Sequence, residues 1–179
     1  MDQIYGVLKL RIQRGINLAI RDLRSSDPYV VVSMGTQKLK TKIMHKDLNP
    51  EWNEELTLML LLIGMVDDIK TPIHLKVFDK DMFSADDEMG EAVIDIKPYV
   101  KCWNKGLEKL PDGCVVKRIQ PNENNYLAEE SPCIWHNGTI IQRMLLKLRN
   151  VECGELLCEL EWLSVLGSMG LLELQQLHA

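Results

Sequence analysis

Short segments in which apolar and polar residues alternate recur along most of the chain. They are VLKLRI (7–12), PYVVVSM (28–34), KLKTKI (38–43), ELTLML (55–60), IHLKVF (73–78), GEAVIDI (90–96), TIIQRMLLKL (139–148) and ELLCELEW (155–162). A period of two is typical of strands with one buried face, and turn residues separate many of the segments. The pattern therefore predicts an all-β fold, an eight-stranded antiparallel β-sandwich of two packed sheets.

The alternation stops between Lys97 and Gly138, after the sixth expected strand. This stretch carries Trp103 and Trp135, which we expect to be core anchors rather than ligand platforms, because large aromatic side chains dominate protein cores. Long segments between strands usually bear function. We therefore expect a single domain over 1–163 with an insert at 97–138. A C-terminal tail at 164–179 follows, either as a short helix or disordered.

Composition narrows the class of protein. A length of 179 residues suits one domain with a real core, and a net charge of −5 argues against a nucleic-acid partner. The five cysteines show no CxxC pairing, which favours reduced thiols. The start of the chain lacks the apolar core of a signal peptide, and the longest apolar run, 56–66, is too short to span a bilayer. We expect a soluble, intracellular protein.

Acidic residues in two loops could hold a metal ion. Asp22 and Asp27 follow the first expected strand, and Asp79, Asp81 and Asp87 follow the fifth. Both loops can emerge at the same end of a sandwich, where converging carboxylates repel one another unless a hard cation or protons are present. Calcium prefers six to eight oxygen ligands, so these residues are suited to it.

Two other interpretations of DKDMFSADDEMG (79–90) need to be weighed. An EF-hand loop that began at Asp79 would need glycine at its sixth position and glutamate at its twelfth, where this chain has Ser84 and Gly90. The EF-hand is therefore excluded. A solvated acidic turn remains open for this stretch taken alone.

Three motifs together resemble a C2 domain, the calcium- and phospholipid-binding β-sandwich. They are SDPYV (26–30), LNPEWNE (48–54) and DKDMFSADDEMG (79–90), and the resemblance covers roughly residues 5–96 and 139–163. It implies that Ca²⁺ is held by the side chains of Asp22, Asp27, Asp79, Asp81 and Asp87, with backbone carbonyls near Arg21 and Lys80 as further donors. Asp86 and Glu88 match no ligand position, and we interpret them as solvated charge.

The same resemblance implies contacts with an anionic phospholipid membrane. Met82 and Phe83 lie at the tip of the third loop and could insert into the lipid interface, unless they pack against the loop itself; Leu23 and Arg24 are candidates on the first loop. Alternation in a strand would turn Lys38, Lys40 and Lys42 to one face. Lys40 and Lys42 match the lysine-rich patch with which some C2 domains bind phosphoinositides, and a solvated strand face is the alternative.

The insert and the last strands are similar to a narrower family, the plant C2-domain abscisic-acid-related (CAR) proteins. The matching stretches are KPYV (97–100), LPDGCVVKRIQP (110–121), NYLAEES (125–131) and LRNVECGELLCELEW (148–162). The resemblance implies a calcium-dependent adaptor that recruits PYR/PYL/RCAR abscisic acid receptors to the plasma membrane, with residues 97–138 as the receptor-binding segment. Location at the cell membrane, in the cytoplasm and in the nucleus is implied as well. The alternative is an activator of a YchF-type GTPase that acts in solution, for which Arg118 and Arg143 are weak candidates.

An enzyme is the least supported class. The histidines, His45, His74, His136 and His178, are scattered, and none forms a recognisable pair with a nucleophile. The chain also departs from the CAR pattern in two places. The link MLLLIGMVDDIKTP (59–72) looks longer and more apolar than usual, and the tail LGSMGLLELQQLHA (166–179) ends in an unfamiliar leucine-rich segment.

Overall fold

Ten strands and two short helices make up the described part of the chain, residues 3–63, 71–103 and 106–164 of a computed structural model. The strands are β1 (Gln3–Ile16), β2 (Pro28–Met34), β3 (Gln37–Lys40), β4 (Glu51–Ile63), β5 (Ile73–Asp79), β6 (Asp87–Ile94), β7 (Val115–Ile119), β8 (Ser131–His136), β9 (Thr139–Lys147) and β10 (Glu155–Ser164). The helices are α1 (Lys97–Val100) and the 3-10 helix η2 (Leu107–Lys109).

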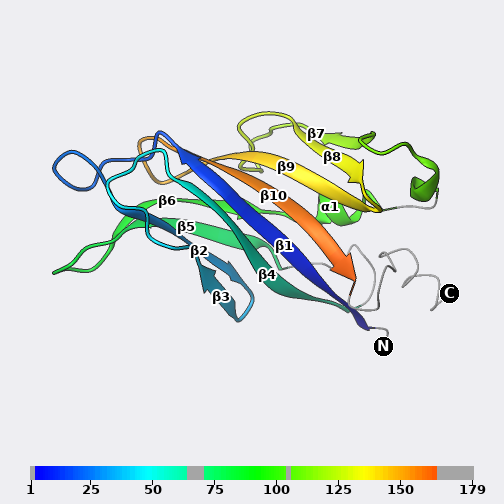
Figure 1. The fold of residues 1–179 in the computed structure, drawn as a ribbon, viewed down its shortest axis with the longest axis horizontal. Coiled ribbons are helices and arrows are strands. Elements are labelled where there is room, and N and C mark those ends of the chain that lie inside the picture. The colour runs from blue at the N-terminus through cyan, green and yellow to red at the C-terminus, as the bar shows by residue number, and fades with distance from the viewer. Residues whose placement is uncertain (1–2, 64–70, 104–105, 165–179) are drawn as a thin grey trace.

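The strands form two antiparallel sheets that pack face to face (Figure 1). One sheet has the order β4-β1-β10-β9-β8-β7 and the other the order β3-β2-β5-β6. Alternation along the strands produces the core between them: every second residue of β2 is buried, and Leu8, Leu10 and Ile12 of β1 are fully buried. The expected all-β sandwich is confirmed.

All eight expected strands are present, and the insert adds two that the sequence did not indicate. β7 pairs with β8, and β8 pairs with β9, so the insert widens the six-stranded sheet at its β9 edge. The reason for the omission is physical. VVKRI of β7 is mostly exposed, and SPCIWH of β8 contains a proline, so neither shows the apolar alternation of a half-buried strand.

The start of the insert is anchored in the core by Tyr99. Its hydroxyl donates to the carbonyl of Ile140 at 2.7 Å and accepts from the backbone N–H of Trp162 at 2.7 Å. Burial raises the pKa of Tyr99 far above its usual range, so the hydroxyl stays neutral. Trp103 and Trp135 pack against the core as an edge-to-face pair, with ring centroids 6.2 Å apart, as expected for core anchors.

Several strand boundaries differ from those expected, and two of the differences are informative. Strand β3 ends at Lys40 because Thr41 is drawn into the sandwich, where its N–H donates to Val30 O and its Oγ1 accepts from Val30 N–H. The apolar link at 59–72 begins as strand, since β4 continues to Ile63 and pairs with the first residues of β1. The rest of the link at 64–70 and the tail at 165–179 lie outside the described residues.

The cysteines are unpaired, as the sequence predicted. All five cysteines are free thiols. Within the described ranges, no helix is long and apolar enough to cross a membrane.

Candidate metal centre

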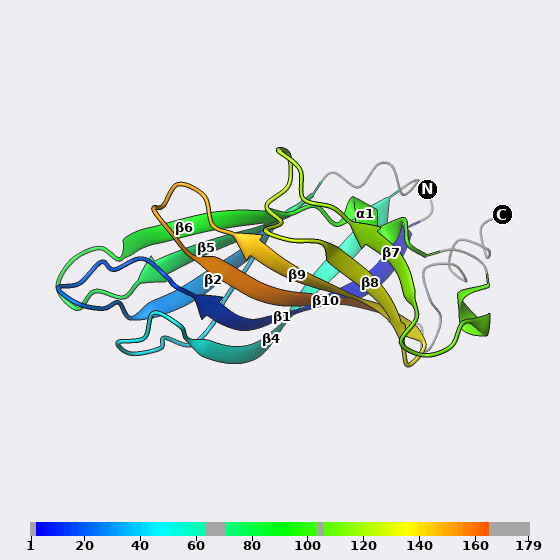
Figure 2. The ribbon, with the colours of Figure 1, turned by 90° about the horizontal axis from the view of Figure 1, so that it is seen from above.

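Two loops that carry the acidic residues project from the same end of the sandwich. The β1–β2 loop (17–27) and the β5–β6 loop (80–86) both project from that end in the two views (Figures 1 and 2). Strand pairing fixes this arrangement, because Pro28 lies opposite Asp79 and Asp79 lies opposite Asp87. The N–H of Lys80 also donates to Asp27 O at 3.0 Å. Residues more than fifty positions apart therefore meet, as the sequence predicted.

Asp79 is the most constrained carboxylate of the set. It is only 1% exposed, and its Oδ1 accepts from the N–H of Asp27 at 2.6 Å. Its Oδ2 has no hydrogen-bond partner among the described residues. Burial raises the pKa of Asp79, and the negative charges of Asp22 and Asp81 raise it further. An unpartnered carboxylate oxygen in a negative environment is suited to a cation.

The other aspartates surround Asp79 at different depths. Asp27 is half-buried, and its Oδ1 accepts from the N–H of Lys46 at 2.7 Å; Asp22 and Asp87 are exposed, and Asp81 is half-buried. Within the described part of the chain, no three acidic, histidine or cysteine side chains are close enough together to hold a metal ion. The five carboxylates thus share one end of the fold, but the predicted convergence into a metal-binding cluster is not seen among them, because like charges repel one another. Their oxygens are the donor type that calcium takes, so the residues fit the ion chemically.

Arg21 has a structural role beyond the carbonyl role expected for it. Its guanidinium donates to the carbonyl of Glu88 at 3.0 Å and to both carboxylate oxygens of Glu152, the shorter contact being 2.6 Å. The pairing lowers the pKa of Glu152 to about 2. Arg21 therefore ties the β1–β2 loop to β6 and to the β9–β10 loop. The sequence predicted no role for Glu152 at this site.

The interpretation of Asp86 as solvated charge is wrong. Asp86 is half-buried, accepts from the hydroxyl of Tyr29 and from the N–H of Asp81, and pairs with Lys80 Nζ at 3.1 Å. Tyr29 is chiefly responsible for the lowered pKa of Asp86. The side chain therefore shapes the β5–β6 loop from within. Glu88 is exposed and pairs only loosely with Lys76, at 3.6 Å, in agreement with its expected solvated position.

Large apolar side chains protrude from the tips of the two loops. Met82 is 86% exposed, Phe83 96% and Leu23 102%, the three highest values among the large apolar residues that the structure describes. The alternative that Met82 and Phe83 pack against their own loop is therefore wrong. Exposed apolar groups gain nothing from water, so these loop tips are a candidate contact surface.

Only two of the three lysines of the expected second lipid site lie on the smaller sheet. Lys38 and Lys40 alternate with half-buried residues on β3 and are exposed. Lys42 is also exposed but lies beyond the end of β3, where its N–H donates to Glu54 Oε2 at 2.8 Å. Two of the three lysines therefore share a strand face, and the third follows it.

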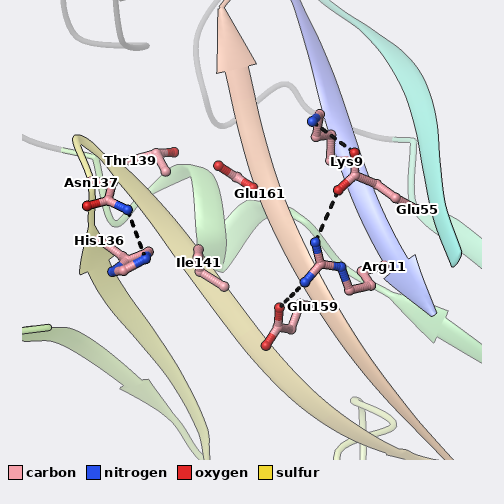
Figure 3. Close-up of a pocket in the computed structure, with 9 residues that line it drawn as sticks. All are labelled: Lys9, Arg11, Glu55, His136, Asn137, Thr139, Ile141, Glu159 and Glu161. Carbon is pink, nitrogen blue, oxygen red and sulfur yellow. Dashed lines mark hydrogen bonds and ion pairs between the residues drawn. The ribbon is translucent and has the colours of Figure 1, made fainter. Parts of the chain in front are cut away.

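A separate polar hollow of about 280 Å³ lies across strands β4, β1, β10 and β9 (Figure 3). Lys9 Nζ lies 2.8 Å from Glu55 Oε1, and Arg11 reaches both Glu55 and Glu159, at 3.4 and 3.8 Å. His136, at its edge, is exposed, as are His45 and His74; His178 lies outside the described residues. The hollow contains none of the loop aspartates, and its cations are paired with carboxylates of the same sheet.

Comparison with known proteins agrees with this architecture. The C2 domain family model matches residues 6–111. Among solved structures, the pair of C2 domains of Extended-Synaptotagmin 2 has a TM-score of 0.59 at 23% identity, covering 89% of this chain and 41% of that one. The calcium-bound form of the same pair has a TM-score of 0.58 at 20% identity, covering 89% and 46%. At this identity, the likeness shows the fold.

Sequence relatives are much closer. Protein C2-DOMAIN ABA-RELATED 4 of Arabidopsis thaliana is 50% identical over 171 residues, which cover 96% of this chain and 93% of the relative. GTPase activating protein 1 of Oryza sativa subsp. japonica is 48% identical over 170 residues, covering 95% and 99%. With this identity over nearly its whole length, the chain belongs to the family of plant C2-domain ABA-related proteins.

Proposed function

We propose that this C2-domain protein is a calcium-dependent phospholipid-binding adaptor. The single observation that carries the proposal is Asp79, whose Oδ2 is buried without a partner among the described residues, between loops that also bear Asp22 and Asp81. Without calcium, this end of the fold repels an anionic bilayer. With Ca²⁺ bound by the five aspartates and the carbonyls of Arg21 and Lys80, the local charge would reverse and lipid phosphates could approach.

The exposed tips of the loops support a membrane as the partner. Leu23, Met82 and Phe83 are exposed on the same two loops as the carboxylates, so docking of the loops would remove their apolar surface from water. Lys38, Lys40 and Lys42 would add attraction to anionic headgroups, at about 1 kcal/mol for each basic residue close to the surface. Calcium would thus control the charge while the loop tips and lysines supply affinity. The protein would be peripheral at the cell membrane when calcium rises, and cytoplasmic or nuclear otherwise.

The names of the relatives suggest the cargo. Several relatives carry the words C2-DOMAIN ABA-RELATED in their names, and the insert at 97–138 lies on the β9 edge of the sandwich, away from the aspartate loops (Figure 2). A protein bound to the insert would therefore leave the calcium loops free to face a bilayer. We propose that the cargo is an abscisic acid receptor of the PYR/PYL/RCAR type. In this role the chain is not an enzyme.

Sedimentation with anionic liposomes tests the proposal. We expect the protein to pellet with phosphatidylserine-containing liposomes in calcium and to stay in the supernatant in chelator. The double variant Asp79→Ala, Asp81→Ala should stay in the supernatant in both. Asp112→Ala with Glu129→Ala removes two exposed acids outside the loops and should behave as the wild type. Binding that is unaffected by chelator would rule the mechanism out.

A second candidate function, stimulation of a YchF-type GTPase in solution, is favoured by the name of the rice relative, GTPase activating protein 1. An activator can supply an arginine to the transition state of GTP hydrolysis. Arg118 is paired with Glu130 at 2.5 Å and Arg143 with Glu159 at 3.1 Å, so either would have to leave its partner. GTP turnover of the partner, measured with the wild type and with Arg118→Ala and Arg143→Ala, decides whether an arginine is supplied. Stimulation that persists in chelator would favour this function over the first.

A further inference from the structure

The insert forms one wall of a second pocket, of about 180 Å³, between the edge of β6 and strand β9. We call it the insert pocket. Its floor includes the buried core residues Ile94, Met144 and Leu146, and its outer wall is the segment 119–127. Of the described residues that line it, Asp95 alone carries a charged side chain. The pocket is therefore apolar at its base and bordered by amide groups.

The outer wall is held in place before any ligand binds. Asn125 accepts from the N–H of Leu127 at 3.2 Å and donates to Gln120 O at 3.0 Å. The guanidinium of Arg149 donates to the carbonyl of Asn125 at 2.6 Å and lies 4.0 Å from the ring centroid of Tyr126. A preformed wall lowers the entropy that binding must lose.

One lining residue carries an unused acceptor. Gln142 is 3% exposed, and its Nε2 donates to Ser131 Oγ at 3.0 Å. Its Oε1 has no hydrogen-bond partner in the described part of the chain. A buried acceptor left unpaired costs about 1–3 kcal/mol. A guest that brings a hydrogen-bond donor to this position would remove that cost.

The β6 side of the pocket offers backbone groups to an extended chain. Glu91 exchanges both of its backbone hydrogen bonds with Arg149, on the side of β6 away from β5. Backbone groups of alternate residues in an antiparallel strand point to the same side, so the N–H and C=O of Val93 also point away from β5. Val93 lines the pocket. An extended segment could therefore pair with this edge beside the pocket.

We propose that the insert pocket receives the ring of a tyrosine or tryptophan from an extended segment of a partner protein. Its volume is below the 300–1,000 Å³ or so that is usual for pockets of small-molecule ligands, and it suits one side chain. Tyrosine and tryptophan combine an apolar ring with a hydrogen-bond donor for the unpaired Oε1 of Gln142. Both are common interface anchors. The tail of this chain, 165–179, contains neither residue. The inference rests on the proposed function only in taking the partner to be the protein carried to the membrane.

Nuclear magnetic resonance of the full chain labelled with ¹⁵N tests the assignment. N-acetyl-tyrosinamide and N-acetyl-tryptophanamide should shift the backbone amides of Val93, Tyr126 and Gln142 as one saturable cluster. N-acetyl-leucinamide, the control, should shift them much less because its side chain has no donor. Absence of the cluster, or equal binding of the leucine compound, would overturn the proposal. Self-association of the chain through the pocket, seen by ultracentrifugation, would overturn it as well.

Two variants and a control localise the binding. Asn124→Arg introduces a long side chain at the exposed mouth, where Asn124 has no side-chain hydrogen bond to another described residue; affinity should fall roughly tenfold. Gln142→Met removes the acceptor, and the loss of one hydrogen bond should weaken binding roughly three- to tenfold. Should Gln142→Met fail to fold, Asn124→Arg alone decides. Thr57→Arg, on an exposed position of β4 outside the pocket, should bind as the wild type.

Liposome sedimentation of the same samples separates this proposal from the proposed function. Asn124→Arg should still pellet with anionic liposomes in calcium, because the pocket does not include the aspartate loops. If the ring compounds bind while the wild type never sediments, the pocket stands and the membrane function fails. If the wild type sediments while the ring compounds do not bind, the reverse holds.

Discussion

Asp79 links the structure of the loops to their proposed chemistry. It is buried at the end of β5, and both neighbouring loops bring further negative charge toward it. Because the pKa of Asp79 is higher in the folded chain than in the unfolded one, its ionisation destabilises the calcium-free fold. That cost is fully present above the folded pKa and disappears as the pH falls toward the ordinary value of 3.8.

Replacement of Asp79 by asparagine tests this charge directly. Asparagine keeps an acceptor for the N–H of Asp27 but removes the charge, so in chelator at about pH 7 we expect Asp79→Asn to be more stable than the wild type. The difference should shrink at about pH 4, where the wild-type carboxyl is increasingly protonated. Urea unfolding at both pH values measures it. Calcium should stabilise the wild type and have little effect on the variant; a variant that is less stable in chelator at neutral pH would contradict the account.

The apolar loop tips give a second prediction at this scale. Burial of an apolar side chain contributes about 1.5–3 kcal/mol when it is complete, so Met82→Ser and Phe83→Ser should each lower calcium-dependent liposome binding roughly tenfold or more. Stability should not change, because both side chains are almost fully exposed. Met59→Ser is the matched control, since Met59 is 54% exposed on β4, away from the tips. An equal loss with Met59→Ser would mean that the tips do not insert.

Strand β6 depends on a glycine for its approach to the β9–β10 loop. Gly90 has φ +104°, and a Cβ there would lie 2.5 Å from Val151 Cγ1. Asp87 begins the same strand, so this packing also helps to place a candidate ligand. The register of β5 with β6 shifts between Lys76 and Phe78, close to Gly90, in the manner of a bulge.

Gly90→Ala should therefore destabilise the fold more than an alanine at a glycine with similar backbone geometry. Gly138 provides this control, with φ +79° and nothing within 4 Å of a Cβ. Both changes carry the backbone cost of about 1–2 kcal/mol, and Gly90→Ala adds about 1–3 kcal/mol for overpacking against Val151. Unfolding free energies from urea titration compare them. Equal destabilisation would show that the contact with Val151 is unimportant.

Strand β3 carries a prediction about lipid selectivity. Lys38→Gln with Lys40→Gln should weaken binding to phosphoinositide vesicles by about 1 kcal/mol for each lysine, and the loss should shrink at high salt. The control pair is Lys109→Gln with Lys147→Gln, two exposed lysines on η2 and β9. If both pairs weaken binding alike, the effect is one of overall charge and β3 is a solvated strand face.

At the scale of the whole molecule, the sequence predicted the eight strands of the sandwich better than the two strands of the insert. Strands with one buried face, such as β2, show alternation that does not depend on distant residues, so they could be recognised. β7 is mostly exposed and is stabilised by pairing with β8, which a local pattern cannot show.

The candidate site was likewise predictable from the sequence only in part. The meeting of Asp27 and Asp79 was predictable because sandwich topology brings the two loops together. The bonds of Asp86 to Tyr29 and of Arg21 to Glu152 join side chains from segments far apart in the sequence, and residue types alone do not determine such contacts.

Calorimetric titration of calcium into the protein, with and without phosphatidylserine-containing liposomes, shows whether the aspartate loops bind calcium and lipid together. If calcium and lipid bind as one unit, each must strengthen the binding of the other by the same factor. We expect calcium to bind to the protein alone and to bind at least tenfold more tightly with liposomes, and both signals to be lost in the Asp79→Ala, Asp81→Ala variant. A calcium affinity that liposomes leave unchanged, or that survives in the double variant, would contradict the account.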